Sequence, residues 1–75
     1  MDFDYKGWTV HLYKDDESYY FVWSAYGPNG ERIGDHEGGD LKTMRDAKDQ
    51  IKEWIDEYET NPFEFKMRYP ELVRW

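Results

Sequence analysis

Apolar and polar residues alternate near the start of the chain. In GWTVHLY the side chains of Trp8, Val10 and Leu12 fall on one side, which is the period of a half-buried strand. A polar, turn-like stretch follows at residues 14–18. YYFVWSAY, at residues 19–26, is then rich in the aromatic and β-branched residues that strands favour. The pattern predicts two strands joined by the polar turn.

A strong turn signal follows the second predicted strand. GPNG, at residues 27–30, combines proline with Asn-Gly, as expected where a chain reverses between antiparallel strands. The next stretch, ERIGDHE at residues 31–37, contains Gly34 and a single apolar residue, Ile33. It is predicted to pair as a short third strand at the edge of a sheet.

The hydrophobic period then changes to that of a helix. Thr43, followed three residues later by Asp46, resembles a capping box with Asp in the Glu position. Pro62 ends the helix because it disfavours helical geometry at Asn61. Between these signals, apolar residues recur at spacings of three and four and draw one stripe along a helix. The stripe consists of Met44, Ala47, Ile51, Trp54, Ile55 and Tyr58.

The C-terminal segment, residues 61–75, is compatible with two roles. Phe63, Phe65 and Met67 alternate with charged residues, so this stretch could form a fourth strand and lie over or beside the sheet. Alternatively, the segment is an arm that binds a partner. The predicted organisation is a single β-β-β-α domain over residues 1–60, followed by a segment that is docked on the sheet or binds a partner.

Together these elements predict an α+β fold in which a three-stranded antiparallel sheet packs on one C-terminal helix. The strand residues expected to face the helix are Trp8, Val10, Leu12, Phe21, Trp23, Ala25 and Ile33. The opposite side would carry Thr9, His11, Tyr13, Tyr20, Val22, Ser24 and Tyr26. That side is unusually aromatic for a surface that meets only water. Because tyrosine supplies rigid amphipathic contacts at interfaces, Tyr13, Tyr20 and Tyr26 are candidate partner-binding residues.

Composition narrows the choice of partner. The chain of 75 residues has a formal net charge of −7, so a nucleic-acid backbone or an anionic membrane surface should repel it. A protein with a basic surface is the expected partner.

The absence of cysteine excludes disulfides and thiolate metal sites, and aromatic residues, 20% of the chain, supply the core. No apolar run approaches the roughly 18 residues of a membrane span, and a cytoplasmic protein is expected.

Catalytic and metal-binding signals are weak. Asp35, His36, Glu37 and Asp40 cluster before the helix, but their spacing matches no metal-binding loop. The positive end of a helix dipole favours acids at this position without a metal. The chain has no cysteine nucleophile and no glycine-rich phosphate loop, and a domain of this size has little room for a water-excluding pocket. No enzymatic activity, metal or cofactor is expected.

The predicted helix has an acidic, interleaved outer face. Asp49 and Glu53 form a like-charge pair four residues apart, a small cost that stability alone does not explain. One interpretation is a solvated face with partial ion pairs. The other is a negative surface that binds a partner. It would be formed by Asp49, Glu53, Asp56 and Glu57, with the turn at Asp15, Asp16 and Glu17 and the loop residues Asp35, Glu37 and Asp40.

The order of elements and the helix start resemble the small arm-DNA-binding domain of phage-type tyrosine recombinases. In that family an F-x-T-x-x-x-A pattern opens the helix, and Leu41, Thr43 and Ala47 correspond to it here. Gly7 and Trp8 match the opening of the first strand, and the resemblance covers about residues 6–58. The family's sheet carries basic residues to DNA, whereas this one is aromatic or acidic. The resemblance therefore implies the fold but not DNA binding.

These observations favour a small acidic, non-enzymatic protein-binding module. The expected role is that of an inhibitor or adaptor that engages a basic surface of a nucleic-acid-handling protein, as a DNA mimic would. In size and charge the chain is similar to regulatory and anti-defence proteins of phages and mobile elements. The alternative is an assembly protein that forms a homodimer through its aromatic sheet face.

Overall fold

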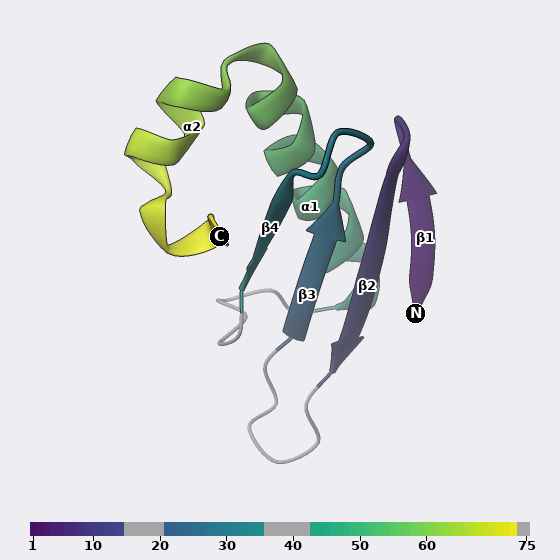
Figure 1. The fold of residues 1–75 in the computed structure, drawn as a ribbon. Helices are drawn as coiled ribbons and strands as arrows, with labels where there is room; N and C mark the ends of the chain where they lie inside the picture. The colour runs from purple at the N-terminus through teal and green to yellow at the C-terminus, as the bar shows by residue number, and fades with distance from the viewer. Residues whose placement is uncertain (15–20, 36–42, 74–75) are drawn as a thin grey trace.

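The protein is described by a computed structural model that covers residues 1–14, 21–35 and 43–73. Within these residues the fold is α+β, with a four-stranded antiparallel sheet followed by two helices and a 3-10 turn (Figure 1). The predicted class is confirmed, but the prediction of three strands and one helix is wrong. The elements are β1 (Asp2–Tyr5), β2 (Trp8–Lys14), β3 (Phe21–Tyr26), β4 (Arg32–Asp35), α1 (Met44–Thr60), α2 (Pro62–Arg68) and η1 (Pro70–Leu72).

The additional strand, β1, forms a hairpin with β2. Its turn residues Lys6 and Gly7 have φ angles of 49° and 83°. Positive φ at both central positions is the geometry of the type I′ turn that joins twisted antiparallel strands. The sequence signal was weak because Asp2–Tyr5 has only four residues, two of them carboxylates, and lysine replaces the usual Asn or Asp of the turn. Phe3 and Tyr5 pack against the core.

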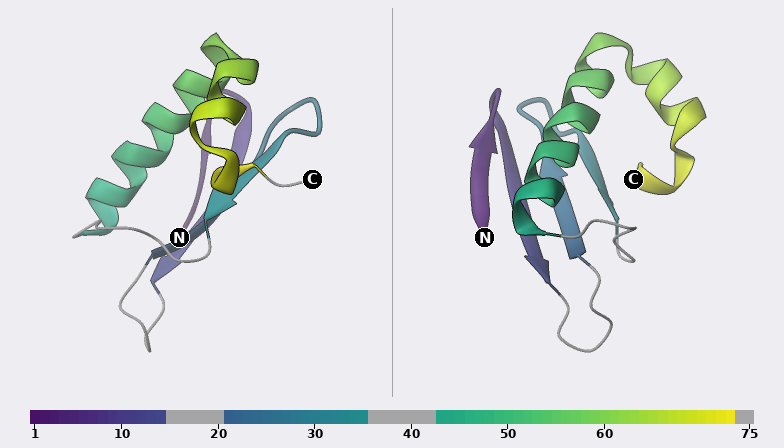
Figure 2. Two further views of the ribbon diagram at one scale, coloured as in Figure 1. Left: turned by 90° about the vertical axis from the view of Figure 1, so that its left-hand side faces the viewer. Right: turned by 180° about the vertical axis from the view of Figure 1, so that it is seen from behind.

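The strands lie in the order β1-β2-β3-β4, and one face of the sheet is buried along β2 and β3 and partly buried at β1. Every strand residue expected to face the helix is buried, which confirms the alternation that was used to assign the two faces. Those residues join Ala47, Ile51, Ile55 and Tyr58 of α1 in a single cluster. Both helices lie on this side of the sheet, and no described element covers the other side (Figure 2).

Strand β4 is an edge strand, as predicted. The glycine in it is required by close packing, since a Cβ at Gly34 would lie 2.7 Å from the carbonyl oxygen of Trp23 on β3. The outer edge of β4 is partly protected, because Ile33 forms an isolated antiparallel bridge with Val73. The chain therefore returns to the sheet beside β4 at Val73.

Helix α1 begins and ends where the sequence signals place it. The Thr43 side chain accepts a hydrogen bond of 3.1 Å from the backbone N–H of Asp46, which confirms Thr43 as the N-cap. At the other end, Asn61 has φ −154° and ψ 90°, an extended conformation that stops the helix before Pro62.

The C-terminal segment is helical, so the possible fourth strand from Phe63 to Met67 is wrong. Asn61 caps the new helix by accepting a 3.1 Å hydrogen bond from the N–H of Glu64, and the following proline stands in the first turn, where no N–H is needed. Phe65 is 2% exposed, whereas Phe63 is 73% and Met67 70% exposed. The segment thus contributes one phenylalanine to the core rather than an alternating strand face.

Candidate protein interface

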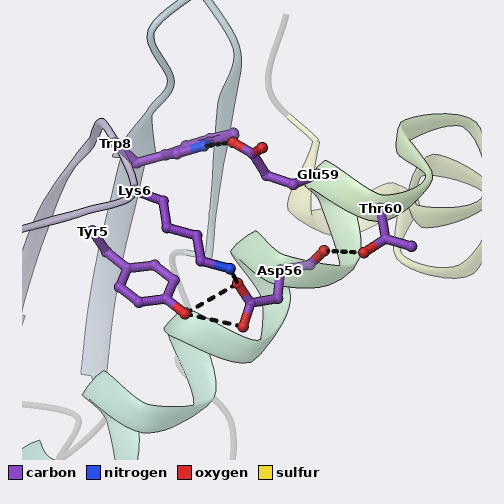
Figure 3. A network of polar contacts seen from close by, with 6 residues as sticks. All are labelled: Tyr5, Lys6, Trp8, Asp56, Glu59 and Thr60. Carbon is purple, nitrogen blue, oxygen red and sulfur yellow. Dashed lines mark hydrogen bonds and ion pairs between the residues drawn. The ribbon is translucent and has the colours of Figure 1, made fainter.

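Asp56 connects helix α1 to the β1–β2 hairpin through hydrogen bonds and an ion pair. Its carboxylate oxygens each lie 3.0 Å from the hydroxyl of Tyr5, and one of them lies 2.7 Å from Nζ of Lys6 (Figure 3). The hydrogen bond from Lys6 lowers the pKa of Asp56, with a further lowering from Tyr5. The same hydrogen bond raises the pKa of Lys6 above its ordinary value. Asp56, a predicted partner-binding residue, therefore already forms contacts with Tyr5 and Lys6 of its own chain.

Two further carboxylates near the C-terminus of α1 also have internal donors. Indole Nε1 of Trp8 donates a 2.7 Å hydrogen bond to Glu59 (Figure 3). Arg68 of α2 lies 3.2 Å from Glu57 and 2.8 Å from Glu64. Acids are unfavourable at the negative end of a helix dipole, and the last turn of α1 contains no basic residue. Donors from the hairpin and from α2 offset that cost.

The side chains of Lys48 and Lys52 on α1 extend toward aromatic rings of β1. Nζ of Lys48 lies 5.0 Å from the ring centroid of Phe3, and Nζ of Lys52 lies 5.5 Å from that of Tyr5. A cation over an aromatic ring at this distance is attracted by the ring quadrupole. Arg45 is three residues before Lys48 and so continues the same side of the helix. Lys48 and Lys52 thus lie on the side of α1 that faces β1.

Four of the six carboxylates of α1 occupy a separate line, which we call the acidic stripe: Asp46, Asp49, Glu53 and Glu57. Steps of three and four residues place them along one side of the helix, over about 16 Å. Asp46, Asp49 and Glu53 are exposed, and their side chains have no hydrogen bond or ion pair with the described residues. Asp46, an acid of the helix face that was not among the predicted partner-binding residues, belongs to this surface as well.

The predicted acidic surface is only partly assembled. Asp49, Glu53 and Glu57 share the stripe, with Glu57 already paired to Arg68. Asp35 ends β4, where its backbone pairs with Trp23. The other acids of the predicted surface, Asp15, Asp16, Glu17, Glu37 and Asp40, lie outside the described residues, as does Tyr20 of the predicted aromatic face.

A second surface is the uncovered side of the sheet, which we call the open face: Asp2, Asp4, Thr9, His11, Tyr13, Val22, Ser24, Tyr26, Arg32 and Gly34. Tyr13 is 56% and Tyr26 40% exposed. His11 lies 3.0 Å from Asp2 and packs edge-on against Tyr26, over whose ring Arg32 also lies. The structure thus brings the predicted Tyr13 and Tyr26 to one surface.

A shallow groove of about 290 Å³ lies between the end of α1 and α2. Its lining combines Glu57, Glu64 and Arg68 with the aromatic rings of Phe65 and Tyr69. The guanidinium of Arg68 pairs with both carboxylates, so its single positive charge offsets half of their combined charge. Among the described residues, no group of three or more His, Asp or Glu side chains is placed to hold a metal ion, and no helix has the length and apolarity needed to cross a membrane.

Comparisons with known proteins add no relative. No protein family model matches the chain, and no match was found among curated proteins or solved structures. The resemblance to the recombinase arm-DNA-binding domain therefore stays a prediction.

Proposed function

We propose that this protein is a non-catalytic binding module whose acidic stripe engages a basic surface on another protein. The observation that carries the proposal is the separation of charge on α1. Lysines that alternate with acids in the sequence turn toward Phe3 and Tyr5, and Asp46, Asp49 and Glu53 are left exposed and unpaired among the described residues.

The like charges of the stripe have an energetic consequence. Asp49 and Glu53 stand four residues apart, and such a pair destabilises a helix by about 0.2–0.5 kcal/mol. A cationic partner would remove this repulsion on binding. The net charge of −7 would also steer a basic partner toward the protein, with an association rate that falls as salt increases.

The partner that best fits this chemistry is a protein that handles nucleic acid. Such proteins carry lysine and arginine surfaces that neutralise a phosphate backbone, and an exposed row of carboxylates competes for the same cations. Binding there would make the module an inhibitor of nucleic-acid binding, or an adaptor that recruits the partner.

The test uses immobilised protein to capture partners from the source cell at about 50 mM and about 500 mM salt, where screening differs strongly. Glu53→Lys should reduce capture at low salt. Glu71→Lys is the matched control, since Glu71 is also an exposed glutamate but lies on η1, away from the stripe. Adding double-stranded DNA should displace the captured protein.

Two results would contradict the proposal. Capture that is indifferent to salt would mean that charge is not the basis of recognition. An equal loss for Glu53→Lys and Glu71→Lys would mean that net charge, rather than the acidic stripe, governs binding.

A further inference from the structure

The strand register arranges the open face in rows across the sheet. Asp4 lies opposite Thr9, Thr9 opposite Tyr26, and Tyr26 opposite Arg32. One row therefore runs from a carboxylate on β1 to a guanidinium on β4, with a tyrosine between them. Asp4 has no ion pair among the described residues.

The next two rows carry no guanidinium, and only the second has a carboxylate, Asp2 on β1. Asp2, His11, Ser24 and Gly34 form the second row, and Tyr13 with Val22 forms the third. Both carboxylates of the open face are thus at its β1 edge, and its one guanidinium is at the β4 edge. In contrast to the strongly acidic chain as a whole, this face is close to neutral.

We propose that the open face is the interface with a second copy of this chain, related by a two-fold axis that runs along the strands between β2 and β3. Such an axis places each row of one copy over the same row of the second copy, with β1 of one copy over β4 of the other. Asp4 then faces Arg32 of the second copy at both ends of the row. Tyr26 faces Thr9 of the second copy, and Tyr13 faces Val22.

The charge pattern selects this axis over the other two-fold arrangement. An axis across the strands would place β1 over β1 of the second copy, so that Asp2 and Asp4 would face the same acids. It would also leave Arg32 of both copies side by side. Like charges in apposition cost several kcal/mol in an interface, so only the axis along the strands is self-complementary.

The size of the open face predicts a weak, reversible dimer. Four strands at a spacing of about 4.8 Å span about 19 Å, and strands of four to seven residues are about 13–24 Å long. The footprint is thus roughly 300–400 Å² per copy, below the roughly 800 Å² of a standard stable interface. Two sheets packed about 10 Å apart would leave α1 of each copy on the outside.

This inference goes beyond the proposed function, because the open face and the acidic stripe are on opposite sides of the sheet. A dimer would display two acidic stripes, and simultaneous contact with two basic sites would raise the apparent affinity.

The test is sedimentation velocity between about 10 µM and about 1 mM protein, at about 0.15 M salt to limit repulsion between the acidic chains. The wild-type protein should shift from monomer to dimer in this range. Asp4→Arg and Arg32→Asp should each weaken association at least tenfold, because each turns both ion pairs into repulsions. An equimolar mixture of the two variants should restore association, since the mixed dimer regains both pairs.

Association restored by mixing the two variants can come only from ion pairs between the two copies. Within one chain, Asp4 and Arg32 are separated by three strand spacings, about 14 Å, which exceeds the screening length of about 10 Å at 0.1 M salt. The two side chains must therefore meet between copies. Tyr13→Lys, at an exposed position of the third row, is a further variant that should weaken association without burying a charge in the monomer.

Three outcomes would overturn the inference. They are a protein that stays monomeric at about 1 mM, a dimer that is insensitive to both charge reversals, and single variants that are not restored by mixing. Circular dichroism of each variant confirms the native fold, and Glu53→Lys should leave the dimer unchanged. A monomer whose acidic stripe still captures a basic protein would refute the dimer alone.

Discussion

Phe65→Ala tests whether the C-terminal segment is part of the core. The Phe65 side chain is 2% exposed, and its ring centroid lies 5.3 Å from that of Tyr58 and 5.1 Å from that of Tyr69. Replacing a buried phenylalanine by alanine removes the transfer free energy and leaves a cavity, at a cost of about 3–5 kcal/mol. A chain of 75 residues has a total stability of about 4–11 kcal/mol. The variant should therefore lose about a quarter or more of its stability.

The same helix provides a matched control. Phe63 is two residues earlier in α2 and is 73% exposed. Phe63→Ala makes the same chemical change outside the core, and surface substitutions of this kind alter stability by about 0.5 kcal/mol or less. The comparison separates burial of the ring from helix propensity, because both variants place alanine in one helix.

Urea unfolding monitored by tryptophan fluorescence measures the difference. With a slope of about 1 kcal/mol per molar urea for a small domain, Phe65→Ala should lower the midpoint by about 3 M or more. The melting temperature should fall by about 12 °C or more, at 4–8 °C per kcal/mol. If the midpoints of Phe65→Ala and Phe63→Ala agree within error, the segment does not contribute to the core and the reasoning fails.

Three further predictions concern single contacts. Thr43→Ala removes the α1 cap and should cost about 1 kcal/mol in urea unfolding; an unchanged midpoint would show that the cap is dispensable. Gly34→Ala places a Cβ 2.7 Å from the Trp23 carbonyl oxygen and should cost about 1–3 kcal/mol, whereas a neutral effect would exclude that close approach. The Asp56 pKa is lowered from 3.8, so its contribution to stability is present above that pH and is lost as the pH falls through the lowered pKa. Asp56→Asn should give a shallower acid limb in a pH series of melting temperatures, and identical limbs would contradict this.

Much of the fold follows from short-range patterns in the sequence. The alternation in β2 and β3 assigned the buried side correctly, because a strand's side chains alternate between two faces. Thr43 and Asn61 marked the ends of α1, because both act on backbone groups within a few residues of themselves.

The elements that were missed depend on contacts with the rest of the chain. β1 is too short for a periodic signal and is stabilised by pairing with β2. The alternation of Phe63, Phe65 and Met67 fits a strand, but only Phe65 is buried once Asn61 starts a second helix. A five-residue pattern does not distinguish these two conformations.

The candidate interface likewise depends partly on local helical spacing and partly on contacts between residues far apart in the sequence. Helical spacing alone places Asp46, Asp49 and Glu53 on one side of α1. The pairing of Asp56, by contrast, depends on Tyr5 and Lys6, about 50 residues away in the sequence. A partner residue and a structural residue cannot be distinguished until the hairpin is in place.

Four properties of this protein can be predicted from its sequence: the α+β class, the buried faces of the central strands, the limits of α1 and the acidic character. Those properties depend on local periodicity, on caps and on composition, which act over a few residues or over the whole chain. Tertiary structure alone decided which charges remain free, because the donors to Asp56, Glu57 and Glu59 come from β1–β2 and α2. It also decided the reversal of charge across the open face, since the strand register places Asp4 and Arg32 in one row.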